Sequence, residues 1–242
     1  MNNEILLVDK PAGVSSFGVV ARVRRRLSDE AGKVKITGKD WAVREKRRKV
    51  KVGHTGTLDP FATGLLVLLV GKGTKRASEF LKLDKEYIAT VKLGEISSTG
   101  DPEGEISPYK EGVRAVTREE VEKVLGEFLG EIEQKVPQYS AVKINGERAY
   151  KLARAGKNIE MPRRKVKIYE LLILGFDWPK LTIRCKVSSG TYIRALGEDI
   201  GVALGVGGYL TELRRTQVGE YRVEEARKIE EIGACPLEKP VV

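Results

Sequence analysis

The most unusual segment of this chain is GHTGTLDPFATGLL, which occupies residues 53–66. Three glycines within 12 residues let the backbone approach another group closely, and they bracket one carboxylate, Asp59, and the single histidine of the chain, His54. The residues alone leave two interpretations open for each side chain. Asp59 followed by Pro60 is a common pairing at the start of a helix, and His54 can be an ordinary turn residue.

The sequence on either side of this segment predicts a sheet with a few helices. Runs rich in Val, Ile, Leu and Tyr indicate strands at residues 4–8, 65–70, 87–93, 166–176 and 181–187. Helices are predicted from Ser15 or Ser16 to about Leu27, over 118–129 behind a capping box of Thr117 and Glu120, and over 191–204. Strands outnumber helices along the chain, which indicates an α+β fold.

The positive charge of the chain is concentrated in one region. The 242 residues include 44 Lys and Arg against 34 Asp and Glu, a formal net charge of +10. Residues 22–51 hold 13 of the basic and 4 of the acidic side chains, a net of +9, so the other 212 residues together carry +1. We expect residues 28–51 to form a solvated basic loop or arm, and the protein to bind an anionic partner.

Composition argues against several classes of protein. The longest uninterrupted apolar run has six residues, 65–70, where roughly 20 are needed to cross a bilayer, and the N-terminus lacks a signal-peptide layout. We therefore expect a soluble, cytoplasmic protein. Cys185 and Cys235 form no Cys-x-x-Cys motif and His54 is alone, so neither a disulfide framework nor a metal site is predicted.

Residues 53–64 resemble the signature of the TruB family, the tRNA pseudouridine-55 synthases that act in the T loop. Further blocks of the family occur in the same order: DKPAGVSS at 9–16, KEY at 85–87, YSAVK at 139–143, GTYIR at 190–194 and LRRT at 213–216. The resemblance covers about residues 4–222. It implies a pseudouridine synthase fold, with a mixed, mostly antiparallel sheet, flanking helices and a central active-site cleft.

The resemblance also implies a domain organisation. Residues 1–242 are expected to form a single catalytic domain with a thumb-like segment at about 137–165. The basic segment at about 28–51 is longer than the link expected in bacterial members, so we interpret it as an insert that grips RNA, within which Trp41 stacks on a base or anchors the loop. The chain ends at Val242, which leads us to expect no C-terminal PUA domain.

Seven residues match functional positions of the family. Asp59 matches the catalytic aspartate, a nucleophile for a reaction that breaks the N1–C1′ bond of a uridine and rejoins the uracil through C5. Arg194 matches an active-site arginine that is expected to pair with Asp59 and keep it ionised. The other matches are Tyr87, which stacks on the target base, Tyr192 and Leu213, which line the uracil pocket, His54, which contacts the flipped nucleotide, and Lys10, near the active site.

Each match has a simpler alternative in the residues themselves. Arg194 can be a surface arginine in the first turn of a helix, Tyr87 an ordinary strand tyrosine, and Lys10 a turn lysine in water. Basic side chains of the thumb-like segment, together with Arg214 and Arg215, are expected to contact the RNA backbone, although a solvated charged face explains each of them equally well.

The expected function is therefore isomerisation of uridine 55 in the T stem-loop of tRNA. The resemblance implies no cofactor, no metal, no obligate protein partner and a monomer. Two alternatives remain open. One is a dyskerin-like enzyme that takes its target from a guide RNA, and the other is a non-catalytic protein that binds or folds tRNA.

Overall fold

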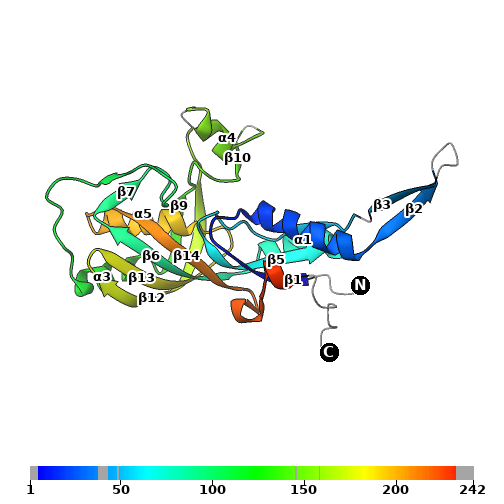
Figure 1. Cartoon of the computed structure of the whole chain (residues 1–242). Helices are drawn as coiled ribbons and strands as arrows, with labels where there is room; N and C mark the ends of the chain where they lie inside the picture. The colour runs from blue at the N-terminus through cyan, green and yellow to red at the C-terminus, as the bar shows by residue number, and fades with distance from the viewer. Residues whose placement is uncertain (1–4, 38–42, 48, 145, 158, 233–242) are drawn as a thin grey trace. The chain divides into compact units, whose positions relative to one another are not determined.

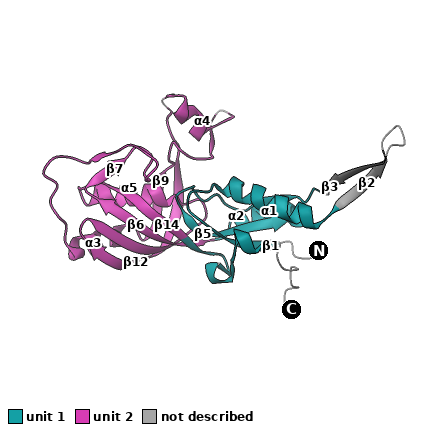
Figure 2. Cartoon of the chain, in the orientation of Figure 1, with its two compact units in different colours: residues 1–83, 215–242 teal, residues 84–214 magenta. Residues whose placement is uncertain are grey.

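The computed structural model describes residues 5–37, 43–47, 49–144, 146–157 and 159–232, with the backbone alone for 33–37 and 43–47. The chain divides into two compact units (Figure 2). Unit 1 comprises residues 1–83 and 215–242, and unit 2 comprises residues 84–214.

Unit 1 is built on a small sheet (Figure 1). Strand β1 (Ile5–Lys10) runs antiparallel to β5 (Thr63–Val70), and β4 (Val52–His54) is also antiparallel to β5. The short β16 (Arg227–Lys228) lies parallel to β1. The 3₁₀-helix η1 (Gly71–Arg76) and helix α2 (Ala77–Leu81) follow β5. Eight residues separate β4 from β5, and this connection contains Asp59.

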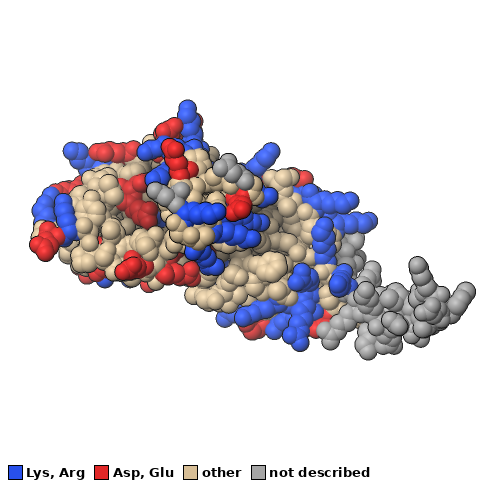
Figure 3. Space-filling view, turned by 90° about the horizontal axis from the view of Figure 1, so that it is seen from above, with Lys and Arg blue, Asp and Glu red and all other residues tan. Residues whose placement is uncertain are grey.

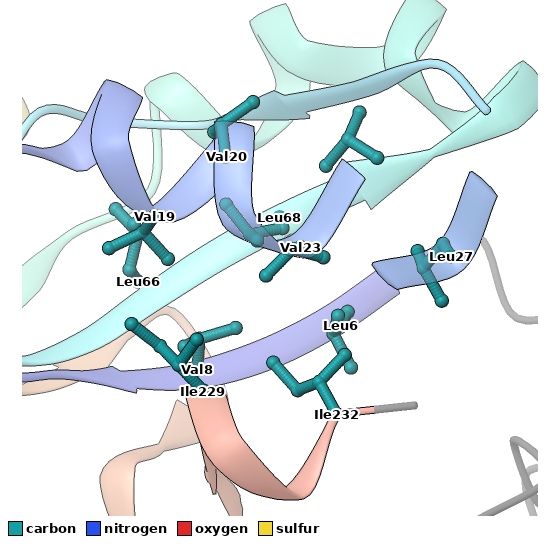
Figure 4. Packing of buried hydrophobic residues seen from close by; sticks show 11 residues of the cluster. Leu6, Val8, Val19, Val20, Val23, Leu27, Leu66, Leu68, Ile229 and Ile232 are labelled. Carbon is teal, nitrogen blue, oxygen red and sulfur yellow. The ribbon is translucent and has the colours of Figure 1, made fainter. Parts of the chain in front are cut away.

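Helix α1 (Ser16–Glu30) covers one face of this sheet. Its N-cap is Ser15, whose side chain accepts a hydrogen bond from the Gly18 N–H at 3.0 Å. The apolar residues of α1 recur at helical spacing and pack on alternate residues of β1 and β5, as Figure 4 shows. The buried cluster contains Val19, Val20, Val23 and Leu27 of the helix, Leu6, Val8, Leu66 and Leu68 of the strands, and Ile229 and Ile232.

In the part of the chain that the structure describes, unit 2 is an antiparallel sheet with two helices of ten or more residues. Strand β13 (Lys180–Val187) pairs with β6 (Lys85–Leu93) on one side and with β12 (Arg163–Asp177) on the other, and β12 pairs with β9 (Gly130–Lys135). Strand β14 (Gly208–Val218) pairs with β6. The helices are α3 (Arg118–Glu127) and α5 (Ile193–Ala203).

Smaller elements complete the chain. Two short antiparallel hairpins in unit 2 join β7 (Glu95–Ser97) to β8 (Ile106–Pro108), and β10 (Lys143–Ile144) to β11 (Glu147–Arg148). Helix α4 (Ala149–Arg154) follows β11. In unit 1, β15 (Tyr221–Arg222) pairs with the end of β14, and the 3₁₀ turns η2 (Val223–Glu225) and η3 (Ile229–Glu231) flank β16.

The α+β prediction is confirmed, as are the five predicted strands and three helices. Thr117 and Glu120 form the predicted capping box of α3, and Gly205 follows α5 with a φ of +72°. The prediction of a helix to Leu27 was short, because α1 continues to Glu30.

The structure excludes one interpretation of Asp59 and adds regular structure to the expected loop or arm at residues 28–51. Asp59 and Pro60 do not begin a helix, since the connection stays irregular until β5 starts at Thr63. Residues 28–51 are not a loop throughout, because they include the end of α1 and an antiparallel hairpin of β2 (Lys33–Thr37) and β3 (Val43–Arg47). Trp41 and Cys235 lie outside the described residues. Within the described part of the chain, no helix has the length and apolar character that a membrane crossing requires.

Candidate active site

The segment that carries Asp59 is an irregular loop with a defined backbone. Thr55 N–H donates to the Val67 carbonyl at 3.1 Å, and Ala62 N–H donates to the Asp59 carbonyl at 3.2 Å. Between these bonds Leu58 is buried and Asp59 is half-buried. The loop therefore presents one carboxylate from a backbone that is tied down on both sides.

Ser16, at the first position of α1, holds the residue before Asp59. The Ser16 hydroxyl donates to the Leu58 carbonyl at 2.9 Å and accepts from the Leu58 N–H at 2.8 Å. Both groups are buried, so the two bonds satisfy backbone atoms that water does not reach. The loop cannot move away from α1 without breaking both of them.

Lys10 holds the residue after Asp59. Its side chain is 0% exposed, and its Nζ donates to the carbonyls of Pro11 at 2.9 Å, Val14 at 2.7 Å and Pro60 at 3.1 Å. The Gly13 N–H donates to the same Pro60 carbonyl at 2.8 Å. Lys10 is therefore not a turn lysine in water, since the three donors of a buried ammonium meet three carbonyl acceptors here.

Arg215 holds the start of the loop. It is 2% exposed, and its guanidinium donates to the carbonyls of Leu65 at 2.7 Å, Gly56 at 3.2 Å and, more weakly, Thr57 at 3.5 Å. Gly64 has a φ of +100°, and a Cβ added there would overlap the Arg215 backbone. The expectation that Arg215 contacts RNA phosphates is wrong, because the fold uses its donors internally.

His54 is the last residue of β4. Burial lowers the pKa of its imidazole, and the positive charge of Arg215 lowers it further. The Gly56 N–H donates to His54 Nδ1 at 3.4 Å, a long contact that suits a neutral ring with its proton on Nε2. His54 is thus a neutral hydrogen-bonding group at neutral pH.

Arg194 lies in the first turn of α5 in unit 2 and is 5% exposed. Its Nη1 forms an ion pair with Asp101 at 3.1 Å and donates to the Thr99 carbonyl at 2.8 Å, while Nη2 donates to the Tyr139 carbonyl at 2.8 Å. Thr99 Oγ1 also donates to Asp101 at 2.6 Å. The surface interpretation of Arg194 is wrong, since a buried guanidinium is held rigidly by these acceptors. Its pairing with Asp59 stays a prediction.

The three remaining predicted residues also lie in unit 2. Tyr87 on β6 and Leu213 on β14 are buried. Tyr192 is the N-cap residue of α5, and the buried Gln134 amide fixes its backbone with bonds of 2.8 and 3.0 Å. The Arg164 guanidinium lies 5.7 Å from the centre of the Tyr192 ring.

Other reactive groups do not suggest a competing site. Cys185 lies opposite Tyr87 in the sheet, and burial raises the pKa of its thiol to about 12, which disfavours the reactive thiolate. Among the described residues, no group of three His, Cys, Asp or Glu side chains is placed to hold a metal ion.

The sequence does not predict that Ser16 and Arg215 hold the loop of Asp59, or that Asp101 pairs with Arg194. From the sequence, Ser16 is predicted only as a helix cap and Arg215 as a contact to RNA, and no pattern points to Asp101. The DKPAGVSS block contains both Lys10 and Ser16, and this is the one signal that pointed to them.

Similar solved structures define the class of the fold. A chain in a crystal structure of a Cbf5–Nop10–Gar1 complex matches 95% of this chain and 53% of its own length, with a TM-score of 0.67 and 28% identity. A structure of an H/ACA RNP bound to a substrate RNA containing 2′-deoxyuridine matches 95% of this chain and 52% of its own, with a TM-score of 0.65 and 26% identity. The fold is that of the pseudouridine synthases.

Sequence comparisons define the family. Residues 44–193 match the N-terminal domain of the TruB family pseudouridylate synthases, and residues 194–238 match the tRNA pseudouridylate synthase B C-terminal domain. This chain belongs to the TruB family.

Two relatives named tRNA pseudouridine synthase B show how far the similarity extends. The protein of Francisella tularensis subsp. novicida is 48% identical over 191 residues, which are 79% of this chain and 63% of the relative. That of Francisella philomiragia subsp. philomiragia is 44% identical over 237 residues, 98% of this chain and 72% of the relative. This chain thus spans slightly less than two thirds of the first relative's length.

Proposed function

We propose that this protein isomerises uridine 55 in the T stem-loop of tRNA to pseudouridine. The observation that carries the proposal is the loop around Asp59, which presents a half-buried carboxylate from a backbone held by Ser16, Lys10 and Arg215. Such preorganisation suits a nucleophile that must meet a substrate atom in one fixed geometry.

The reaction needs only groups that this chain supplies. The N1–C1′ bond of the uridine breaks, the uracil turns, a C5–C1′ bond forms, the C5 proton leaves and N1 gains a proton. Atoms and electrons balance within the substrate, so neither an oxidant nor a reductant takes part. Asp59 acts as the nucleophile, and the bond that its carboxylate forms to the nucleotide breaks again before the product leaves. Arg194 keeps the free carboxylate ionised.

The remaining residues act on a base that has left its stack. Extruding a nucleotide from a structured loop costs a few kcal/mol, which contacts to the phosphates and stacking on aromatic rings offset. In this proposal Tyr87 stacks on the flipped uracil, Tyr192 and Leu213 line its pocket, and the neutral His54 contacts the RNA where the nucleotide was extruded. Lys10 acts through the Pro60 carbonyl and is a positioning residue.

We further propose that the protein acts alone, as a cytoplasmic monomer, and selects the T stem-loop without a guide RNA. The relatives named tRNA pseudouridine synthase B support this choice over the dyskerin-like alternative, because they are 44–48% identical to this chain and the Cbf5 complex 28%. Exposed basic side chains of the thumb-like segment, such as Lys143 and Arg148, are suited to phosphate contacts.

The test is Asp59→Asn assayed with a T-arm transcript, without added guide RNA, protein or metal. We expect pseudouridine at one loop uridine with the unaltered protein, and binding without conversion in the variant. Asp177→Asn, which removes an exposed carboxylate from the β12–β13 hairpin, is the matched control and should convert normally. Conversion by Asp59→Asn would refute the assignment of the nucleophile, and binding without conversion by the unaltered protein would favour the non-catalytic alternative.

A further inference from the structure

A second basic surface lies on helix α1, outside the candidate active site. The sequence RVRRR at residues 22–26 places four arginines in little more than one turn. Arg22, Arg24 and Arg25 are exposed, and in the described part of the chain no acidic partner is recorded for them. Basic side chains gather along the part of the surface where α1 lies in Figure 3.

Arg26, the fourth of these arginines, has a structural role. Arg26 is half-buried, and its Nη1 donates to the carbonyls of Glu230 at 2.7 Å and Ile232 at 2.9 Å. It therefore ties α1 to the chain beyond β16. No comparable contact is recorded for Arg24 or Arg25 within the described residues, so stability of the fold does not explain them.

Arg24 and Arg25 line a surface depression of about 380 Å³ with Ala21, Ser28 and Lys49. Its lining contains three cations and one hydroxyl, and no carboxylate. The chain at Lys49 is held beside the helix, because the Val50 N–H donates to Ser28 Oγ at 3.1 Å. Lys49 lies near the end of the basic segment at residues 28–51. The fold therefore brings its charge into the same depression as those of Arg24 and Arg25.

The neighbouring depression on α1 is chemically different. It is lined by Arg22, Arg25 and Arg26 together with Asp29, Glu230 and Ile229. The two carboxylates there repel an anion, whereas all the charged side chains that line the depression beside Lys49 are positive. An anionic ligand is therefore favoured on the Arg24, Arg25 and Lys49 side of the helix.

We propose that Arg24, Arg25 and Lys49 bind the phosphate backbone of the substrate RNA away from the reacting nucleotide. This inference rests on the proposed function, because it takes tRNA as the ligand. Guanidinium groups suit phosphate oxygens, since their donors form a planar fork and they are weakly hydrated. A depression whose polar lining is three cations and one hydroxyl fits a contact to phosphates that positions RNA without reading its sequence.

Helix α1 connects this surface to the loop of Asp59. Its first residue, Ser16, holds Leu58, and Arg24 and Arg25 follow eight and nine residues later, about 12–14 Å along the helix axis. Phe17 lies in sequence between Ser16 and the two arginines, and its side chain is 67% exposed. RNA bound along this face would thus be placed relative to Asp59 by one rigid element.

The experiment compares Arg24→Gln/Arg25→Gln with the unaltered full chain by equilibrium binding of a full-length tRNA transcript across a range of salt. We expect roughly tenfold weaker binding at moderate salt, and a slope of log K against log salt that is smaller by about two. The value of kcat at saturating tRNA should be unchanged. Arg24→Lys/Arg25→Lys keeps both charges and should keep most of the slope.

The matched control is Lys123→Gln/Lys180→Gln, which removes two exposed positive charges from unit 2. An unchanged salt slope in the α1 variant, or an equal loss in the control, would overturn the inference. A fall in kcat with binding intact would also overturn it, because it would assign the arginines to positioning the loop. This test can fail or succeed independently of the proposed function. A protein that makes no pseudouridine can still bind tRNA in a salt-dependent manner, and this variant would then weaken that binding.

Discussion

The Ser16 hydroxyl donates to the Leu58 carbonyl and accepts from the Leu58 N–H, at 2.9 and 2.8 Å. One side chain on α1 thus satisfies both backbone groups of the residue that precedes the candidate nucleophile. Since Ser16 and Leu58 are buried, water cannot replace these bonds, and the position of Asp59 depends on them.

Ser16→Ala should therefore impair catalysis more than binding. Leaving the Leu58 N–H and carbonyl without partners should lower the free energy of unfolding by about 1–3 kcal/mol. Displacement of the loop should reduce kcat on the order of tenfold to a hundredfold. Chemical denaturation and single-turnover pseudouridine formation measure the two effects.

Ser15→Ala is the matched control for this prediction. It removes the N-cap bond to Gly18, which costs about 1 kcal/mol, but leaves the bonds to Leu58 in place. Its kcat should be close to that of the unaltered protein. Equal losses of kcat in the two variants would show that the helix start matters and the bonds to Leu58 do not.

Arg215→Lys separates the structural role of this residue from RNA binding. Lysine keeps the charge but cannot donate to the Leu65, Gly56 and Thr57 carbonyls with the geometry of a guanidinium. We expect kcat to fall roughly tenfold or more, with an unchanged salt dependence of tRNA binding. A changed salt slope with normal kcat would contradict this structural role of Arg215.

His54 should titrate below its ordinary pKa of 6.5, because burial and then the charge of Arg215 disfavour the imidazolium. The chain has one histidine, so NMR shows a single imidazole to follow. Unfolding in urea should return the midpoint to about 6.5. A midpoint at or above 6.5 in the folded protein would contradict the described burial of the ring.

The same shift predicts how stability depends on pH. Between the folded pKa and 6.5 the unfolded chain binds more protons at His54 than the folded chain does. The free energy of unfolding should therefore rise with pH through this window, and the contribution should be complete above 6.5. His54→Asn should flatten this part of the curve.

The contribution of Glu198 on α5 to the free energy of unfolding should fall, not rise, with increasing pH. Burial, together with the charges of Asp199 and Asp101, raises the pKa of its carboxyl from 4.5 to about 7, although the charge of Arg194 opposes the shift. Its contribution to stability is full below about 4.5 and is lost as pH rises towards 7. Glu198→Gln, neutral at every pH, should be more stable than the unaltered protein at pH 8, on the order of 1–2 kcal/mol after allowance for solvent screening.

The control for Glu198 is measurement about one unit below pH 4.5, where its carboxyl is mostly protonated in both the folded and the unfolded chain and the two proteins should unfold at nearly the same denaturant concentration. A Glu198→Gln variant that is less stable at pH 8 would mean that the carboxylate is favourably paired in the folded protein.

Patterns in the sequence are sufficient to predict the local elements and the family. Apolar residues at helical spacing specify α1, α3 and α5, and alternation in 181–187 specifies β13, because these patterns act between neighbours along the chain. The motif around Asp59 needed no structure to identify, since its residue types and spacing are unusual. The five blocks in series predicted the TruB family that the comparisons show.

Which charged residues stabilise the fold and which face solvent follows from long-range packing and cannot be predicted from local patterns. Lys10, Arg194 and Arg215 belong to residue types that are usually exposed, and all three are buried on carbonyl or carboxylate acceptors from distant parts of the chain. Arg24 and Arg25, of the same type as Arg215, are exposed. The sequence specifies the charge of each side chain. The acceptors that a buried charge contacts come from segments that are distant in the sequence, so local patterns do not predict them.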